Sequence, residues 1–316
     1  MDKSKKPLPS HLQDFLDWID VEKGLSPKSQ ENYSRFLKRF FDWLKIKKLE
    51  ELKPHELTRE HVFDYRLFLS RSTRSARTNE PLKKSTQNYY LIALRMFLSF
   101  FAHRNFLSLP VEKVPLARDK SERHVRFMEL EQLEKLFEAP DITTPQGIRD
   151  RSILETFFST GLRISELVAL NADQIKIGKG GREVFELSIQ GKGGRIRTVY
   201  FSLRALLWLE KYMEVRSDTH PALFVAFGKN GKKISRLTSR SIEKSFKHYI
   251  IKAGLPLIMT PHAMRHSFGT NLLKNGVDLR VIQEFLGHKN IAATQMYAHV
   301  TSKQLKDIHK NLHGKK

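Results

Sequence analysis

The chain has 316 residues, a length that favours two domains, each large enough to bury a core of its own. Lys and Arg number 56 against 34 Asp and Glu, and the resulting net charge of +22 disfavours a role confined to small anions and favours a polyanionic partner. A content of 40% hydrophobic and 10% aromatic residues excludes a purely basic tail without folded domains. The composition therefore predicts a globular protein that binds nucleic acid.

The sequence contains no cysteine, which excludes disulfides, a thiolate zinc site and a thiol nucleophile. The first ten residues are basic but lead into no apolar signal region, and no stretch approaches the roughly 18 apolar residues of a membrane span. We expect a cytoplasmic protein that makes no contact with a membrane.

Helical patterns fill the predicted first domain, residues 1–112. Helices are expected over about 12–21, from Ser26 onward, from Thr58 onward and over about 85–101. Ser26 followed by Pro27 is typical of a helix start, with a capping hydroxyl and a proline at the first helical position. Because the connections are short, the four helices are expected to form a small bundle.

Two of these helices begin with the same pattern, Lys-Ser-x-x-Asn. Ser and Asn are common at helix starts, so the repeat has an ordinary explanation as helix capping. The alternative is that two helix N-termini present these side chains to phosphates or base edges of DNA. The candidate DNA-binding residues are Lys28, Ser29, Asn32, Lys84, Ser85 and Asn88.

Prolines and alternating charges replace the helical period after the bundle, which predicts a linker over 113–126 and a second domain over 127–316. Helices near 129–138 and 148–159 precede a change of period. Phe185, Leu187 and Ile189 alternate as in a strand, a glycine-rich turn follows at 191–194, and 196–201 is the expected returning strand. Further helices are predicted over 238–253, 261–275, 278–286 and 291–297, with a tail helix over 301–313. The fold class expected is mainly α with a small β-sheet.

Four segments of the second domain carry polar residues that helix and hairpin packing does not require. Each residue alone has an ordinary explanation, such as a surface arginine or a solvated hairpin tip. The candidates are Arg163, Lys192, His262, Arg265, His288 and Tyr297. Together they supply two guanidiniums for the oxygens of a phosphodiester, a tyrosine nucleophile, a lysine to protonate the leaving 5′ oxygen, and histidines to assist proton transfer.

Other chemistries fit these segments less well. His262 and His266 have the i, i+4 spacing of a zinc helix, but Ala263 stands where a catalytic glutamate would be expected, so a structural role is favoured for His266. The turn at 191–194 lacks the spacing of a phosphate-binding loop. The sequence offers no carboxylate cluster for Mg²⁺, and we expect an enzyme without metal or cofactor.

The six residues, in this order and in these contexts, resemble the site of the tyrosine recombinase (phage integrase) family, and especially its bacterial Xer type. The motifs are T-G-L-R-I-S-E-L, the hairpin lysine, P-H-A-M-R-H-S-F, L-G-H and T-Q-M-Y-A-H. The resemblance covers nearly the whole chain. It implies an N-terminal SAM-like four-helix bundle and a C-terminal α+β catalytic domain that close as a C-shaped clamp on double-stranded DNA.

The resemblance also implies a role for each residue. Arg163 and Arg265 would bind the scissile phosphate, Lys192 would be the general acid and Tyr297 the nucleophile. His262 and His288 would assist as hydrogen-bond and acid/base groups, and Glu166 would orient Arg163.

Assembly is implied as well. A homo- or hetero-tetramer on DNA would exchange strands through a 3′-phosphotyrosyl intermediate and a Holliday junction, with a DNA translocase as a possible activator. The tail helix would dock on a neighbouring protomer through Leu305, Ile308 and Leu312, although packing within its own chain is an alternative.

The expected function is site-specific DNA recombination, as in chromosome dimer resolution or mobile-element integration. Type IB topoisomerase-like relaxation of DNA and a non-catalytic DNA-binding protein are the alternatives. The sequence does not define the target site, or whether one recombinase or two carry out the exchange.

Overall fold

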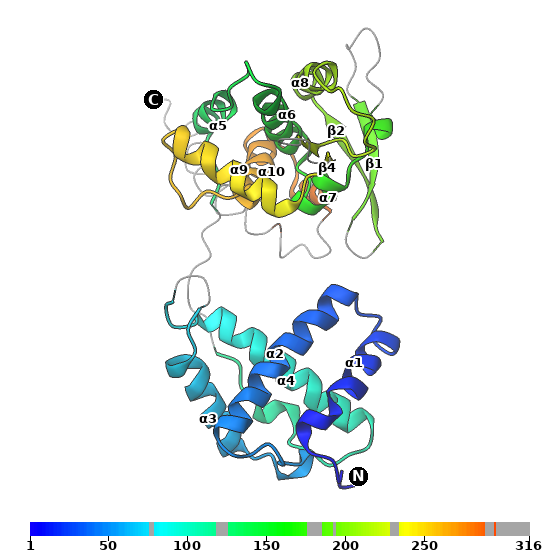
Figure 1. Cartoon of the computed structure of the whole chain (residues 1–316), viewed down its shortest axis with the longest axis vertical. Helices are drawn as coiled ribbons and strands as arrows, with labels where there is room; N and C mark the ends of the chain where they lie inside the picture. Colours follow the sequence, from blue (N-terminus) through cyan, green and yellow to red (C-terminus); the bar gives the residue numbers. More distant parts are fainter. Residues whose placement is uncertain are drawn as a thin grey trace, which may run out of the picture. The chain divides into compact units, whose positions relative to one another are not determined.

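The structure is a computed structural model, and it describes residues 1–75, 79–117, 126–175, 185–191, 194–227, 234–287 and Thr294 (Figure 1). The chain divides into two compact units, Met1–Glu122 and Arg123–Lys316, and each is described by itself. Of the linker predicted over 113–126, residues 118–125 lie outside the described residues. Residues 113–117 belong to the first unit, where Val114 is fully buried.

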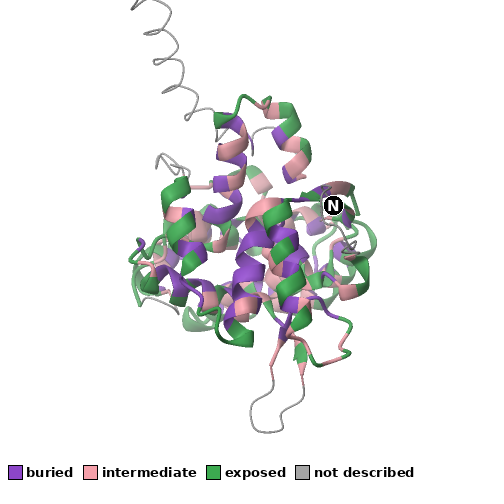
Figure 2. Cartoon of the chain, turned by 90° about the horizontal axis from the view of Figure 1, so that it is seen from above, coloured by how far each residue is buried: buried purple, intermediate pink, exposed green. Residues whose placement is uncertain are grey.

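The N-terminal unit is the predicted four-helix bundle. Its helices are α1 (Leu12–Val21), α2 (Pro27–Ile46), α3 (Arg59–Leu67) and α4 (Lys84–His103), with short helical turns at Leu8–His11, Pro54–Glu56, Phe68–Ser72 and Val111–Lys113. Aromatic side chains fill the core, and the ring centroids of Phe97 and Phe101, both fully buried, are 4.8 Å apart. Along helices of the chain as a whole, buried and exposed residues alternate, as the amphipathic pattern predicts (Figure 2).

The second unit is built around one buried helix. Its helices are α5 (Leu130–Glu138), α6 (Pro145–Thr160), α7 (Ile164–Ala169), α8 (Leu203–Glu214), α9 (Ser239–Lys252), α10 (Pro261–Lys274) and α11 (Leu279–Leu286), with a short turn at Ala172–Gln174. Helix α6 packs against α5, α8 and α10, and most of its residues are buried. Helix α8 had not been predicted, although Ser202 caps its start and Leu206 and Leu209 lie on its buried face.

The predicted hairpin is confirmed. Strands β1 (Phe185–Gln190) and β2 (Ile196–Phe201) pair antiparallel, with Phe185 opposite Phe201 and Gln190 opposite Ile196. A second pair, β3 (Val225–Ala226) and β4 (Ser235–Arg236), was missed because two-residue strands are too short to show an alternating pattern. The helix predicted over 291–297 lies outside the described residues apart from Thr294, and the tail helix predicted over 301–313 lies wholly outside them.

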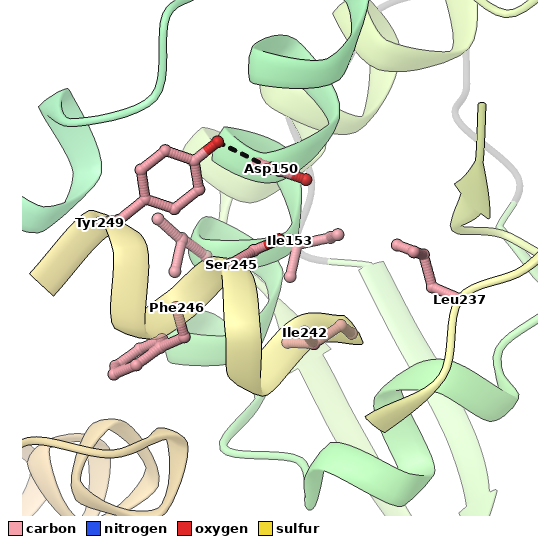
Figure 3. A pocket seen from close by; sticks show the side chains of 8 residues that line it. Asp150, Ile153, Leu237, Ile242, Ser245, Phe246 and Tyr249 are labelled. Atoms are coloured by element: carbon pink, nitrogen blue, oxygen red, sulfur yellow. Dashed lines mark hydrogen bonds between the residues drawn. The ribbon is translucent and has the colours of Figure 1, made fainter. Parts of the chain in front are cut away.

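A buried polar cluster fixes α9 on α6 (Figure 3). The Asp150 carboxylate accepts bonds of 2.8 and 2.6 Å from the Arg149 guanidinium and one of 2.7 Å from the Tyr249 hydroxyl. Burial and the neighbouring Asp150 raise the pKa of Tyr249, so its hydroxyl remains a donor. These bonds satisfy groups that would be costly to bury alone, and they join α9 to α6.

Along the described ranges, no helix combines the length and the apolar composition that crossing a membrane requires.

Candidate active site

The corner between α6 and α7 positions Arg163. Gly161 ends α6 in the left-handed conformation, with a φ of 57°, and Arg163 is the residue that caps α7. One carboxylate oxygen of Glu166 accepts the Arg163 backbone N–H at 2.8 Å, and the other accepts the Arg163 Nη1 at 2.8 Å. Glu166 therefore holds both the backbone and the side chain of Arg163, as expected of a residue that orients this arginine.

Helix α10 carries the second arginine. Arg265 is only 4% exposed, and its Nη1 donates to the Gly161 carbonyl at 2.5 Å. Its other terminal nitrogen, Nη2, donates to the Leu286 carbonyl. His262 lies one turn earlier and is exposed. Because residues at i and i+3 share a helix face, His262 and Arg265 project from the same side of α10.

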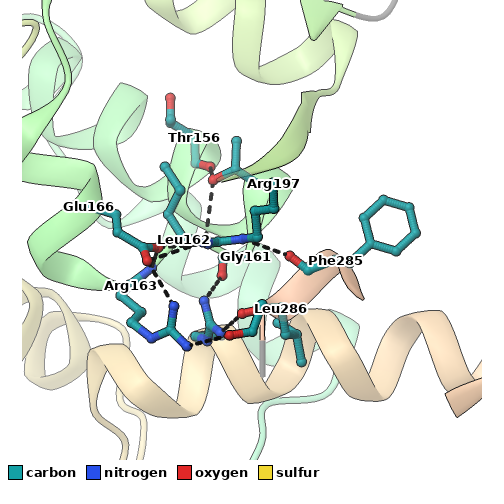
Figure 4. A network of polar contacts seen from close by, with 11 residues as sticks. Thr156, Gly161, Leu162, Arg163, Glu166, Arg197, Phe285 and Leu286 are labelled. Carbon is teal, nitrogen blue, oxygen red and sulfur yellow. Dashed lines mark hydrogen bonds and ion pairs between the residues drawn. The ribbon is translucent and has the colours of Figure 1, made fainter. Parts of the chain in front are cut away.

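The end of α11 is the meeting point of three arginines (Figure 4). Arg197 donates to the Phe285 carbonyl, Arg265 donates to the Leu286 carbonyl, and Arg163 donates to the Gly287 carbonyl. The last carbonyls of a helix have no partner within the helix and carry partial negative charge. The C-terminus of α11 therefore binds three cations and brings together arginines from three separate elements.

Arg197 is a residue that the sequence analysis missed. Its Nη1 and Nη2 donate to the two oxygens of Glu166 at 3.1 and 2.7 Å, and its Nε donates to the Phe285 carbonyl at 3.1 Å. The sequence contains an indication of this role, because residues two apart in a strand share a face. Arg197 is two residues before Val199 and four before Phe201, and both of these are buried. A charged residue on the buried side of a strand requires a buried partner.

The electrostatics of this cluster favour an anion. Burial opposes the charge of Glu166, but hydrogen bonds from Arg197 and from Arg163 lower its pKa to about 2, so it is ionised. Three guanidiniums and one carboxylate leave an excess of two positive charges. The Arg163 side chain is 27% exposed and can meet a ligand from solvent. Such preorganised charge suits a phosphate on which negative charge develops.

His266 follows Arg265 in α10 and is partly buried. Burial, with help from the nearby His262 and Arg265, lowers the pKa of His266 to about 4. This imidazole is therefore neutral near pH 7. Among the residues that the structure describes, no group of three His, Asp or Glu side chains is placed to bind a metal ion.

Lys192, His288 and Tyr297 lie outside the described residues, but Gly191 and Gly287, which directly precede Lys192 and His288, are described. A methyl group at Gly191 would be 3.1 Å from the Arg197 Nη1, and one at Gly287 would be 2.8 Å from the Arg197 Cδ. Both residues therefore border the arginine cluster, and each directly precedes one of the candidates.

The first set of DNA-binding candidates lies in the first two turns of α2. The Lys28 Nζ is 2.6 Å from a carboxylate oxygen of Glu31, and both side chains are largely exposed. The Ser29 hydroxyl is 3.1 Å from that of Ser26, and the Asn32 oxygen accepts from Arg35 at 3.0 Å. These contacts are local, so the side chains remain at the surface.

The second set differs at its asparagine. Lys84 is exposed and Ser85 half-buried at the start of α4, but the Asn88 amide exchanges two bonds with the Ala117 backbone, at 2.9 and 2.8 Å. Asn88 thus fixes the backbone of Ala117 beside α4. Lys84 borders a hollow that Phe63, Leu67 and Ala117 line together with Arg66, Ser70 and Gln87, so a largely apolar surface carries two cations suited to phosphates.

Comparison with family models accounts for both units. The model described as "Phage integrase family" matches residues 126–304, and the one described as "Phage integrase, N-terminal SAM-like domain" matches residues 12–105. The two matches follow the division of the chain into a helical bundle and a unit that carries the arginine cluster.

Relatives match at full length. Tyrosine recombinase XerD of Listeria monocytogenes serotype 4b (strain F2365) is 32% identical over 308 residues, which cover 96% of this chain and 98% of the relative. Tyrosine recombinase XerC of Proteus mirabilis is 33% identical over 306 residues, covering 96% and 93%.

Solved structures share the fold. XerH site-specific recombinase, bound to palindromic difH substrate in a post-cleavage complex, superposes with a TM-score of 0.69 at 22% identity, over 95% of this chain and 84% of that one. The Tn1549 transposon integrase, in complex with circular intermediate DNA, gives a TM-score of 0.68 at 19% identity, over 92% and 95%.

Proposed function

Since the chain belongs to the phage integrase family, and its full-length relatives include Xer tyrosine recombinases, we propose that it is a site-specific recombinase that cleaves and rejoins double-stranded DNA. The observation that carries the proposal is the convergence of Arg163, Arg197 and Arg265 on the end of α11. It supplies excess positive charge to the segment that leads into His288.

Arg163 and Arg265 bind the non-bridging oxygens of the scissile phosphate in this proposal. Guanidiniums recognise phosphate through paired N–H donors, and fixed donors need no reorganisation when charge develops in the transition state. Glu166 and the Gly287 carbonyl hold the Arg163 guanidinium, and the carbonyls of Gly161 and Leu286, at the ends of α6 and α11, hold that of Arg265. These bonds provide that fixation.

The Tyr297 oxygen attacks phosphorus and forms a 3′-phosphotyrosyl bond, while the bond from phosphorus to the 5′ oxygen breaks. One of the two histidines, His262 or His288, accepts the tyrosine proton, and both hydrogen-bond the phosphate. Lys192 donates a proton to the leaving 5′ oxygen. Rejoining is the reverse, with a 5′ hydroxyl from the partner duplex as the attacking group. Exchange of the first pair of strands forms a Holliday junction, and exchange of the second pair resolves it and completes recombination.

The proposal also includes DNA binding by the N-terminal unit and assembly of several protomers on DNA. The starts of α2 and α4 meet the duplex in the N-terminal unit, and four protomers, identical or of two kinds, assemble with exchange of the tail helix 301–313. A chromosome or a mobile element is the substrate, which places the protein in the cytoplasm, and a DNA translocase is a possible activator. Topoisomerase-like relaxation is not favoured, because the full-length relatives are recombinases.

The test uses a duplex site selected from a randomised library by retention on the protein, then nicked so that cleavage releases a short fragment and traps the adduct. We expect an SDS-resistant complex formed in EDTA, lost in Tyr297→Phe and retained in Tyr200→Phe. Failure to trap an adduct on the selected site, or a strict requirement for Mg²⁺, would contradict the mechanism. A plasmid with two sites should yield recombinants, whereas relaxed topoisomers alone would indicate the topoisomerase alternative.

A further inference from the structure

We infer that Arg197 is a positioning residue for DNA cleavage, which holds Arg163 in its working geometry through Glu166 and joins β2 to the end of α11. The inference rests on the proposed function, because it assigns Arg163 to the scissile phosphate. Arg197 lies outside the six residues on which the resemblance to the family depends.

The first observation is the way one carboxylate is shared. Glu166 gives both oxygens to the Arg197 guanidinium, at 3.1 and 2.7 Å, but only one oxygen to the Arg163 side chain. A two-bond pair is the favoured geometry between arginine and a carboxylate. Without Arg197, Glu166 would be able to take Arg163 in such a pair and turn its guanidinium away from the phosphate.

The second observation is that Arg197 borders two segments that lead to further candidates. Its Nε donates to the Phe285 carbonyl at 3.1 Å, and its stem fills the space beside Gly287, where a methyl group would be 2.8 Å from Cδ. Its Nη1 would be 3.1 Å from a methyl group at Gly191. One side chain therefore ties the end of β1, β2 and the end of α11 together.

The third observation is that Arg197 is engaged by the protein itself. Its Nε, Nη1 and Nη2 each donate to a protein oxygen, and both terminal nitrogens bond the Glu166 carboxylate. In this inference Arg197 acts through Glu166 and not by direct contact with DNA. Lysine has a single charged nitrogen and cannot span two carboxylate oxygens and a carbonyl in this way.

The test compares Arg197→Lys with the wild-type chain on the trapping duplex. We expect the affinity for the duplex to stay within about twofold and the single-turnover cleavage rate to fall by roughly 10- to 100-fold, the cost of a displacement near 1 Å at a reacting group. Arg204→Lys is the matched control, because Arg204 also bridges two carboxylates, Glu134 and Glu155, away from the site. Cleavage by this control should be unchanged.

Combining Arg197→Lys with Glu166→Gln distinguishes an effect of Arg197 on the position of Arg163 from a general loss of protein stability. If Arg197 acts through Glu166, the double variant Glu166→Gln/Arg197→Lys should cleave no more than about threefold slower than the slower single variant. Losses that multiply would overturn the inference. So would an Arg197→Lys variant whose affinity for the duplex falls in parallel with its cleavage rate, since that pattern indicates a direct contact.

Folding is checked by thermal unfolding of each variant. If Arg197→Lys does not fold, the neutral pair Glu166→Gln/Arg197→Met replaces it, because it leaves neither Glu166 nor Arg197 as a buried charge without its partner. Full cleavage by this pair would overturn the inference. If the wild-type chain cleaves the duplex and Arg197→Lys cleaves it equally fast, the role of Arg197 is refuted but the proposed function stands. If the wild-type chain forms no adduct, the proposed function is refuted as well.

Discussion

Replacement of Glu166 by glutamine should destabilise the protein by an amount that depends on pH. In the folded chain Glu166 is 8% exposed, and bonds from Arg163 and Arg197 lower its pKa from the usual 4.5 to about 2. A difference of 4.5 minus 2, or 2.5 units, at about 1.4 kcal/mol for each unit, corresponds to about 3 kcal/mol of stability from the ionised carboxylate. Removal of one partner from a buried ion pair gives costs of similar size.

The sign of the pH dependence follows from the lowered pKa. The contribution is fully present above pH 4.5 and is lost as the pH falls toward 2, so the difference between wild type and Glu166→Gln should be about 3 kcal/mol at pH 7 and about half of that at pH 3. Urea unfolding of both proteins, followed by circular dichroism at a series of pH values, measures this difference in stability.

Glu134→Gln is the control for this measurement, because Glu134 also pairs with an arginine, Arg204, but has a side chain that is 49% exposed. Its cost should remain within about 1 kcal/mol. A difference below 1 kcal/mol for Glu166→Gln at pH 7, or one that does not change between pH 7 and 3, would refute the reasoning.

Three further changes test other parts of the structure. Gly161→Ala should cost about 2–4 kcal/mol in urea unfolding, since its φ is 57° and a methyl group would lie 2.4 Å from the Phe268 ring; a cost below 1 kcal/mol would contradict this. The free energy of unfolding of His266→Gln should rise by about 2 kcal/mol relative to that of the wild type between pH 7 and 5. The reason is that the pKa of the wild-type imidazole is lowered to about 4, so the wild-type protein loses stability as the pH falls below 6.5; parallel pH profiles of the two proteins would argue against this. Lys84→Ala should reduce the salt dependence of DNA binding by about one unit, whereas Asn88→Ala should lower stability by about 1 kcal/mol and leave that slope unchanged.

The fold was largely predictable because its helices are amphipathic and carry local start and stop signals. Ser26 with Pro27 begins α2, Gly161 ends α6 and Gly287 ends α11, each at the residue expected from its capping chemistry. The errors have physical reasons. Helix α6 begins at Pro145, three residues before the predicted start, and Thr144 caps it. Its first turn contains a glycine, and the charged residues 149–151 that follow are buried, so the apolar pattern does not mark the start of the helix.

The sequence predicts the residue types of the candidate site but not the network that holds them. The structure brings two of the predicted residues, Arg163 and Arg265, to backbone carbonyls at the end of α11. Every residue except proline has the same backbone donors and acceptors, so the sequence gives no sign of which carbonyls are used. Asn88 shows the converse, because its helix-start pattern matches that of Asn32, yet only the three-dimensional position of Ala117 gives its amide a partner.

The use of carbonyls explains how the cluster can be both fixed and positively charged. If each of the three guanidiniums were held by its own carboxylate, their charges would cancel, and little attraction for a phosphate would remain. The end of a helix offers several oriented oxygens that together carry roughly half a negative charge. Three bonds to the end of α11 therefore fix Arg163, Arg197 and Arg265 at a small electrostatic cost, and Glu166 is the one carboxylate that shares in their fixation.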